Sequence, residues 1–370
     1  MKNSTSDLNY LLHLDRDFVL DASVIYQKYL PLFTLLTIRP MIFYILLSKA
    51  TLMSADLRLG YFINQVAVLL HELNFCFLYR MHVIAPYAAL YCDGPICRIG
   101  LPHSLLMALL SLTVIWTIPT FLFILMRMHQ RVIANTKSIL RFSTSSQVII
   151  LVFLTFLLSL NVFGFGYFSE NCDDCDELEK MPDLAWVIER GGTLFLYGPP
   201  GKGHHFQGET IILSITLATV GIFIAVITVN TARTMSAQSV LLASKTQQAQ
   251  NRLIRVFFWQ LAGVNVCYII PLALMLLATV IDYTFIDSRI IAAVRFVLVP
   301  FFSLEGTQLS LIFLFKNPVH RKILNYVFRH TILRQKSIVT PFESVRHVTE
   351  FRSAFPTAQQ SIPIIVKTVY

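Results

Sequence analysis

The stretch SLLMALLSLTVIWTIPTFLFILM, from Ser104 to Met126, decides the fold. It carries no charged residue along its whole length. About 20 consecutive apolar residues are enough for an α-helix to cross the hydrocarbon core of a bilayer. The stretch therefore predicts a membrane-spanning helix. The run ETIILSITLATVGIFIAVITVN at 209–230 predicts another for the same reason, because almost no polar residue interrupts it.

Apolar runs of spanning length recur seven times along the chain. They lie near 30–49, 59–79, 102–126, 147–168, 210–232, 253–280 and 289–316. The first run is the weakest because Arg39 and Pro40 interrupt it. The sequence therefore predicts an all-α membrane protein with a seven-transmembrane helix bundle at 30–316. No internal repeat is visible, so the pattern does not indicate the duplicated halves of a transporter.

The composition also indicates a membrane protein. Hydrophobic residues make up 55% of the 370 residues, charged residues make up 14%, and the mean hydropathy is +0.63. Ordinary globular chains carry about 25% charged residues. The net charge of +9 indicates an anionic partner. Because the chain has no nucleic-acid-binding signature, we expect that partner to be the anionic inner leaflet and expect no nucleic acid. We expect no cofactor and no resident metal.

The charges predict how the bundle is oriented. If the N-terminus is outside the cell, the cytoplasmic segments hold 19 Lys or Arg residues against 3 acidic ones, and the external segments hold 9 against 16. Basic residues resist translocation, so we expect an external tail at 1–29 and a cytoplasmic tail at 337–370. Asn3, in the chain's single glycosylation sequon, then lies outside. The first thirty residues lack the pattern of a cleaved signal peptide.

The stretch LFLYGPPGKGHHF at 194–206 invites comparison with a phosphate-binding loop. That loop requires Gly, four residues, and then Gly-Lys-Ser or Gly-Lys-Thr. Gly203 stands where the hydroxyl belongs, and Leu196 stands where the first glycine belongs. The predicted orientation also places the stretch outside the cell. We therefore expect no ATPase. We also expect no enzyme, because His71-Glu72 is the single pair of catalytic residue types within the spans and is too little to carry a reaction.

Four of the six cysteines fall in predicted external loops, where disulfides are favoured. Cys92 and Cys97 lie in the first of these loops, and Cys172 and Cys175 lie in the second. Four cysteines permit three pairings. A bridge from Cys97 or Cys92 to the second loop would hold that loop over the mouth of the bundle. The alternative is a zinc site that combines Cys172 and Cys175 with His204 and His205.

Several motifs have a familiar order and spacing. They are FILMRMHQRVIA at 123–134, LNVFGFGYF at 160–168, MPDLAWVIERGGTLFLYGPP at 181–200 and NPVHRKIL at 317–324. Together with the seven-helix layout, they resemble the nematode serpentine chemoreceptors, G-protein-coupled receptors of which class I is the nearest and class H its relative. The resemblance covers about 30–325. It implies a receptor in a sensory neuron or its cilium that detects a small environmental or pheromone-like molecule and signals through a heterotrimeric G protein.

The chain departs from the rhodopsin pattern at two places. Met126 to Gln130 replace the Asp-Arg-Tyr motif, and Arg321 stands where the tyrosine after Asn317-Pro318 would be expected. The contacts of a rhodopsin-style ionic lock are therefore not carried over. The resemblance implies a surface that faces the G protein at the cytoplasmic side. Its candidate residues are Arg127, His129, Gln130, Arg131, Lys245, Arg252, Arg255 and Arg321.

Charges within the predicted spans predict a buried polar cluster, because such charges usually have a partner. Arg39, Glu72 and Glu305 lie roughly 15, 20 and 17 Å from the cytoplasmic ends of their helices. Spans one, two and seven are neighbours in the receptor fold, so we expect Arg39 to be shared by the two carboxylates. The cluster could be a conformational switch or a structural staple, and we favour the staple.

Three residues are candidates for the ligand pocket. Asn265 and Tyr268 precede Pro271, which permits a kink in span six. Arg295 lies near the outer end of span seven and could bind an acidic ligand. Its alternative role is to reach the headgroups or to pair with Asp282 or Asp287.

After the last span, residues 317–336 place Ile323, Leu324, Val327 and Phe328 at helical spacing among basic residues. This predicts an amphipathic helix on the inner leaflet. Two other functions remain as alternatives to the receptor, namely a seven-span ligand-gated channel and a membrane transporter. The charge asymmetry argues against the inverted channel, and the missing repeat argues against the transporter.

Overall fold

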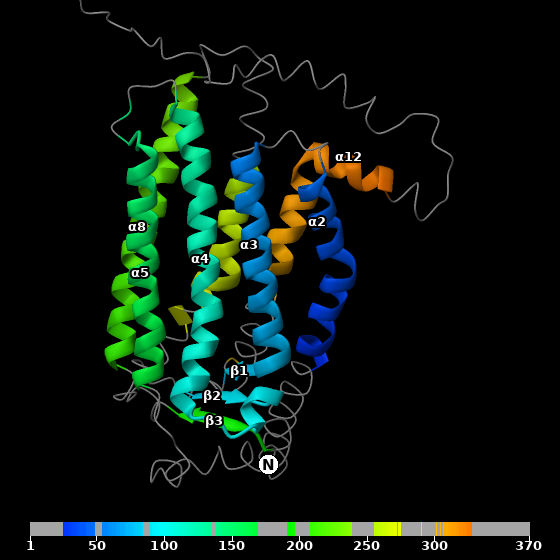
Figure 1. The fold of residues 1–370 in the computed structure, drawn as a ribbon, viewed down its shortest axis with the longest axis vertical. Coiled ribbons are helices and arrows are strands. Elements are labelled where there is room, and N and C mark those ends of the chain that lie inside the picture. The colour runs from blue at the N-terminus through cyan, green and yellow to red at the C-terminus, as the bar shows by residue number, and fades with distance from the viewer. Residues whose placement is uncertain are drawn as a thin grey trace, which may run out of the picture.

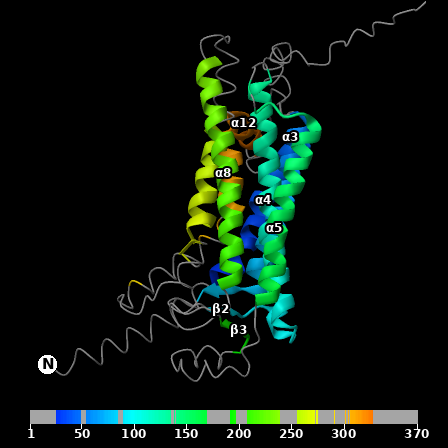
Figure 2. The same ribbon diagram turned by 90° about the vertical axis from the view of Figure 1, so that its left-hand side faces the viewer.

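The computed structural model describes residues 25–48, 54–83, 89–134, 138, 140–168, 191–196, 207–238, 255–271, 273–274, 290, 301, 304 and 306–327. Within these ranges the protein is a bundle of long helices with a small sheet at one end (Figure 1). We call this end the sheet end. The short helix α12 lies at the opposite end of the bundle in both views, and we call that end the α12 end (Figures 1 and 2).

Five helices among the described residues are long and apolar enough to cross a membrane. They are Ile25–Leu47, which contains α2 (Arg39–Leu47); Ala55–Tyr79, which contains α3 (Ala55–Leu73); α4 (His103–Ile133); α5 (Thr144–Phe168); and α8 (Gln207–Gln238). Residues 255–271 and 306–316 are also helical and fall within the predicted sixth and seventh spans. The remainder of those two runs lies largely outside the described residues. The predicted helical class is confirmed apart from the small sheet, and the count of seven spans and the orientation stay predictions.

Helix α4 forms the centre of the described bundle because it contacts α3, α5 and α8. In the most apolar parts of Ala55–Tyr79 and α4, 56% and 50% of the residues are buried, against 22% in α5 and in α8. Leu122, Ile124 and Leu125 of α4 pack with Ile42 and Ile45 of α2 in the main core. By contrast, α5 presents large apolar side chains outward, among them Phe156, Phe163 and Tyr167. An apolar outer face of this kind suits contact with lipid rather than with water.

Two of the helices widen by one residue per turn just before a proline. The π-helical segments are η1 (Thr34–Ile38), two residues before Pro40, and η6 (Asn265–Ile269), two residues before Pro271. Proline lacks a backbone N–H, and its ring clashes with the carbonyl four residues earlier. A π turn removes that clash by shifting the carbonyl. A π segment thus precedes Pro271, and the kink predicted there stays a prediction.

The sheet end combines two loops that are distant in sequence. Strand β2 (Ala89–Cys92) pairs antiparallel with β1 (Met81–Val83) on one side and with β3 (Thr193–Leu196) on the other. Thr193 Oγ1 donates a hydrogen bond of 2.7 Å to the Cys97 carbonyl, and the Tyr91 hydroxyl donates one to the Gly191 carbonyl. Gly192 has a φ of 110° and lies against the Cys92 carbonyl, a conformation that favours glycine.

The structure pairs Cys92 with Cys97, within the first of the two loops. The expected bridge from either of them to the second loop is therefore replaced by a local disulfide. The reason is geometric, because η3 (Pro95–Arg98) follows β2 at once and returns Cys97 to Cys92, 6.0 Å away between Cα atoms. The β2–β3 ladder holds the second loop instead. Cys172 and Cys175 lie outside the described residues, as do His204 and His205.

Candidate functional site: a buried polar cluster

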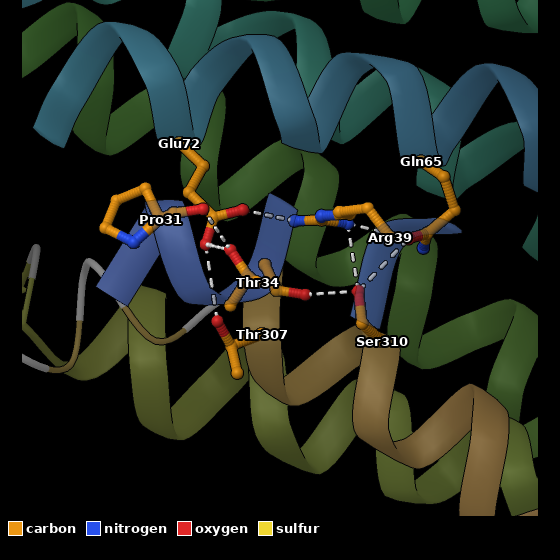
Figure 3. Close-up of polar contacts among 8 residues, drawn as sticks. Pro31, Thr34, Arg39, Gln65, Glu72, Thr307 and Ser310 are labelled. Carbon is orange, nitrogen blue, oxygen red and sulfur yellow. Dashed lines mark hydrogen bonds and ion pairs between the residues drawn. The ribbon is translucent and has the colours of Figure 1, made fainter. Parts of the chain in front are cut away.

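Six polar side chains meet inside the bundle, and we name them the Arg39 cluster (Figure 3). They come from the first helix (Thr34 and Arg39), from α3 (Gln65 and Glu72), and from residues 306–316 (Thr307 and Ser310). Arg39 and Ser310 are 271 residues apart in sequence and are joined by a hydrogen bond of 2.9 Å. The cluster therefore connects the first, second and last of the predicted spans.

An ion pair forms the centre of the Arg39 cluster. Arg39 Nη2 lies 2.5 Å from Glu72 Oε2, and the two side chains are 1% and 2% exposed. Arg39 Nη1 donates to Gln65 Oε1 at 2.8 Å. Removing one partner of a buried pair leaves the other as an uncompensated charge, which costs about 3–5 kcal/mol. Neither Arg39 nor Glu72 can therefore be changed alone without a large loss of stability.

Helix geometry explains how these residues meet. Gln65 and Glu72 are seven residues apart, which is two turns of α3, so they lie on one face. Thr307 and Ser310 are three residues apart and share a face in the same way. Arg39 directly follows η1, so the widened turn sets the direction in which its side chain leaves the helix.

Two hydroxyls of the Arg39 cluster each have two acceptors within reach. Thr34 Oγ1 lies 2.9 Å from the Pro31 carbonyl and 2.9 Å from Glu72 Oε1. Ser310 Oγ lies 2.7 Å from the Gly306 carbonyl and 3.1 Å from Gln65 Oε1. A hydroxyl has only one hydrogen to donate. Each hydroxyl can therefore donate either to a carbonyl of its own helix or to a side chain of α3, which gives the cluster more than one hydrogen-bonding arrangement.

Gly306 lets the last helix approach the ion pair closely. A Cβ atom at this position would lie 2.6 Å from Val68 Cγ1 and 2.8 Å from Arg39 Nη2. Both distances are below van der Waals contact. The absence of a side chain at Gly306 therefore leaves the space that the Arg39 guanidinium occupies.

Sequence reasoning selected Arg39, Glu72 and Glu305, and the structure brings the first two together. Glu305 lies outside the described residues. Thr34, Gln65, Thr307 and Ser310 were missed, because uncharged polar residues are common in spans and only their helical spacing could have singled them out. Glu72 Oε1 accepts from Thr307 Oγ1 at 3.3 Å, so hydroxyls surround the carboxylate.

At the α12 end, the four candidate residues of α4 have different surroundings. Arg131 is exposed and lies 2.5 Å from Asp56 of α3. Arg127 Nη1 donates to Gln147 of α5 at 3.1 Å. Gln130 holds the following loop by donating to the Leu140 carbonyl at 2.9 Å. His129 was expected at the surface, but it is 0% exposed and its Nδ1 lies 2.7 Å from Thr231 Oγ1 of α8. The side chain is therefore buried between α4 and α8.

The other candidates for the G-protein-facing surface divide into two groups. Arg255 and Arg321 are exposed, whereas Lys245 and Arg252 lie outside the described residues. Lys316, which was not predicted, places its Nζ 4.2 Å from the centroid of the Trp259 ring and so joins residues 306–316 to residues 255–271.

Of the three predicted ligand-pocket residues, the structure describes the side chain of Asn265 alone, so the pocket stays a prediction. Asn265 is exposed on the same side of its helix as Trp259, Ala262 and Val266, and its amide bonds the Leu261 carbonyl at 2.8 Å. Asn265 therefore faces outward in the described part of the bundle. The Tyr268 side chain and all of Arg295 lie outside the described residues, and so does Asn3.

Helix α12 (Pro318–Val327) falls at the start of the predicted amphipathic segment. Arg321 and Lys322 are exposed, whereas His320 and Ile323 are 2% and 8% exposed. His320 Nδ1 donates to the Phe313 carbonyl at 2.9 Å, which leaves Nε2 to accept from the Asn317 amide at 3.3 Å. Burial lowers the pKa of the His320 imidazole to about 4. Neutral His320 therefore fastens α12 to the end of the last helix.

The described residues contain no group of three or more His, Cys, Asp or Glu side chains that could hold a metal ion. Long apolar helices around a buried ion pair define the class of the protein, a helical membrane protein with many spans. The model of one family matches residues 25–330, and its description is serpentine type 7TM GPCR chemoreceptor Srh. The chain belongs to this family, which confirms the resemblance to serpentine chemoreceptors, while membership in class I stays a prediction. No curated protein matches the chain.

Proposed function

We propose that this protein is a chemosensory receptor that binds a small environmental or pheromone-like molecule and activates a heterotrimeric G protein. The observation that carries the proposal is the family match across residues 25–330. The receptor has seven spans at 30–316, with its N-terminus outside the cell and its C-terminus inside. It works in the plasma membrane of a sensory neuron or its cilium.

The distribution of exposed charge supports this orientation. Arg131, Arg255, Arg321 and Lys322 are all exposed near the α12 end. Cytoplasmic segments carry an excess of Lys and Arg, so the α12 end is the cytoplasmic one. The sheet end, which contains the Cys92–Cys97 disulfide, is then the external end, where oxidising conditions preserve such bonds.

Contacts near the α12 end suggest how a signal reaches the G protein. Tyr61 of α3 hydrogen-bonds to Gln260 at 3.3 Å, and Lys316 covers Trp259. Both contacts hold residues 255–271 against the rest of the bundle. The Arg39 cluster joins the same last helix to the first two spans. A ligand that rearranged the cluster would move this helix and thereby change the surface offered to the G protein.

Orientation is tested with epitope tags placed before Met1 and after Tyr370 in intact and permeabilised cells. We expect the first tag to be accessible without permeabilisation and the second only after it. The opposite pattern would reject the receptor orientation and favour an inverted ligand-gated channel.

Coupling is tested separately by a panel of small volatile and water-soluble molecules in cells that report cAMP and Ca²⁺. We expect an active molecule to lose its effect when G proteins are inactivated. A current that persists after G-protein inactivation would instead indicate a channel.

A further inference from the structure

Helix α8 carries a buried carboxylate, that of Glu209, which is not part of the Arg39 cluster. Glu209 lies in the first turn of α8, at the sheet end, and is 0% exposed. Neither Oε1 nor Oε2 has a hydrogen-bond partner. An ionised carboxylate buried without a partner is strongly destabilised, so Glu209 either stays protonated or receives a cation from outside the chain.

Gly164 of α5, which faces Glu209, leaves room for the carboxyl group. A Cβ atom at Gly164 of α5 would lie within 1.7 Å of Glu209 Oε2 and 2.9 Å of its Cδ. The glycine therefore provides the notch in which the carboxyl group sits. Gly166, two residues on, faces α4 instead, where a Cβ would meet the Ser104 carbonyl at 3.3 Å. The two glycines of the GFG motif thus serve different helix contacts, and only Gly164 concerns Glu209.

A second buried acceptor lies one turn away along α5. Asn161 is 0% exposed, and its Nδ2 donates to the Leu158 carbonyl at 3.1 Å and to Thr216 Oγ1 of α8 at 3.2 Å. These bonds fix the amide orientation, since the reversed amide would turn its oxygen toward a carbonyl. Asn161 Oδ1 is left without a partner. Residues 161 and 164 are three apart on α5, so Asn161 lies on the same face of the helix as Gly164.

The contact between α5 and α8 thus holds three buried oxygen acceptors that have no donor, two on Glu209 and one on Asn161. We infer that this place is a binding site for the ammonium group of a small primary amine. An ammonium group supplies three N–H donors and the positive charge that Glu209 lacks. A quaternary ammonium ion carries the same charge but no N–H donor, so we expect the site not to bind it. The inference deepens the proposed function, because the sheet end is the external end in that proposal and the amine would be the detected molecule.

Binding is measured on the purified full-length protein in detergent, by the change in thermal unfolding temperature on titration with n-propylammonium chloride. Propan-1-ol, tetramethylammonium chloride and sodium chloride at equal concentration are the controls. We expect n-propylammonium to raise the unfolding temperature in a saturable manner. None of the three controls should do so. Because this readout needs no G protein, its failure is distinguishable from failure of the proposed signalling.

The variant Glu209→Gln keeps the side-chain shape and removes the charge. We expect it to weaken n-propylammonium binding about tenfold or more, because it loses a charge-assisted hydrogen bond. Gly164→Ala should weaken binding as well, and Gly166→Ala is the matched control that should leave it unchanged. If Glu209→Gln fails to fold, Asn161→Leu removes the third acceptor while keeping the Glu209 charge, and it should still weaken n-propylammonium binding. A response equal in wild type and Glu209→Gln, a response to sodium chloride alone, or no response at all would overturn the inference.

Discussion

At the scale of single residues, the Arg39 and Glu72 charges depend on each other for stability. Arg39→Ala leaves a buried carboxylate alone, and we expect it to destabilise the protein by about 3–5 kcal/mol and to reduce surface expression. The double variant Arg39→Ala with Glu72→Ala should recover part of that loss, because no unpaired charge remains. Surface labelling together with thermal unfolding measures all three variants. Losses that simply add would show that the two side chains do not interact.

Gly306 allows a second test of the Arg39 cluster without changing any charge. Gly306→Ala inserts a Cβ against Val68 and Arg39, and we expect a loss of about 1–3 kcal/mol in the free energy of unfolding. Gly221→Ala on α8 is the matched control, since nothing lies within 4 Å of its Cβ position. That change should be neutral or stabilising by about 0.5–1 kcal/mol. Equal effects from the two substitutions would contradict the close packing described at Gly306.

At the scale of elements, the docking of α12 should depend on pH. An unconstrained imidazole has a pKa of about 6.5, whereas burial holds that of docked His320 at about 4. The undocked form therefore binds the proton more readily between these two values. Docking should be fully stable above about pH 6.5 and weaken progressively as the pH falls toward about 4.

Hydrogen exchange of residues 318–327 at pH 7 and at pH 5 measures this effect. We expect faster exchange at the lower pH, after correction for the intrinsic rate. In His320→Gln the amide can still donate to the Phe313 carbonyl but does not titrate, so the difference between the two pH values should largely disappear. An unchanged difference in this variant would assign the pH effect to other groups.

At the scale of the whole molecule, both the β2–β3 ladder and the Cys92–Cys97 disulfide hold the sheet end. A disulfide that closes so short a loop stabilises by about 2 kcal/mol in the chain-entropy description. Replacing both Cys92 and Cys97 by serine should therefore lower the unfolding temperature modestly and leave the ladder in place. Protection of the β3 amides in hydrogen exchange checks this result. Loss of that protection would show that the ladder requires the disulfide.

The sequence predicted the helices better than the contacts between them. The runs at 102–126 and 147–168 correspond to α4 and α5, because length and hydropathy decide which segments can span a bilayer. The Arg39–Glu72 ion pair could also be predicted from the sequence, since buried charges require partners. The hydrogen bonds of the Thr34 and Ser310 hydroxyls and the pairing of strand β3 could not be predicted from the sequence. Their roles depend on which helix or loop lies opposite, and that information is not local in sequence.

The widened turn at Thr34–Ile38 has a consequence for the evolution of this chain. A π turn contains one residue more than an α turn. Deleting a single residue there, such as the exposed Leu36, would restore ordinary helical hydrogen bonding, bring back the clash with Pro40 and turn Arg39 away from Glu72. We therefore expect the length of this segment to be fixed, because a one-residue deletion would cost both the fit around Pro40 and the Arg39–Glu72 ion pair.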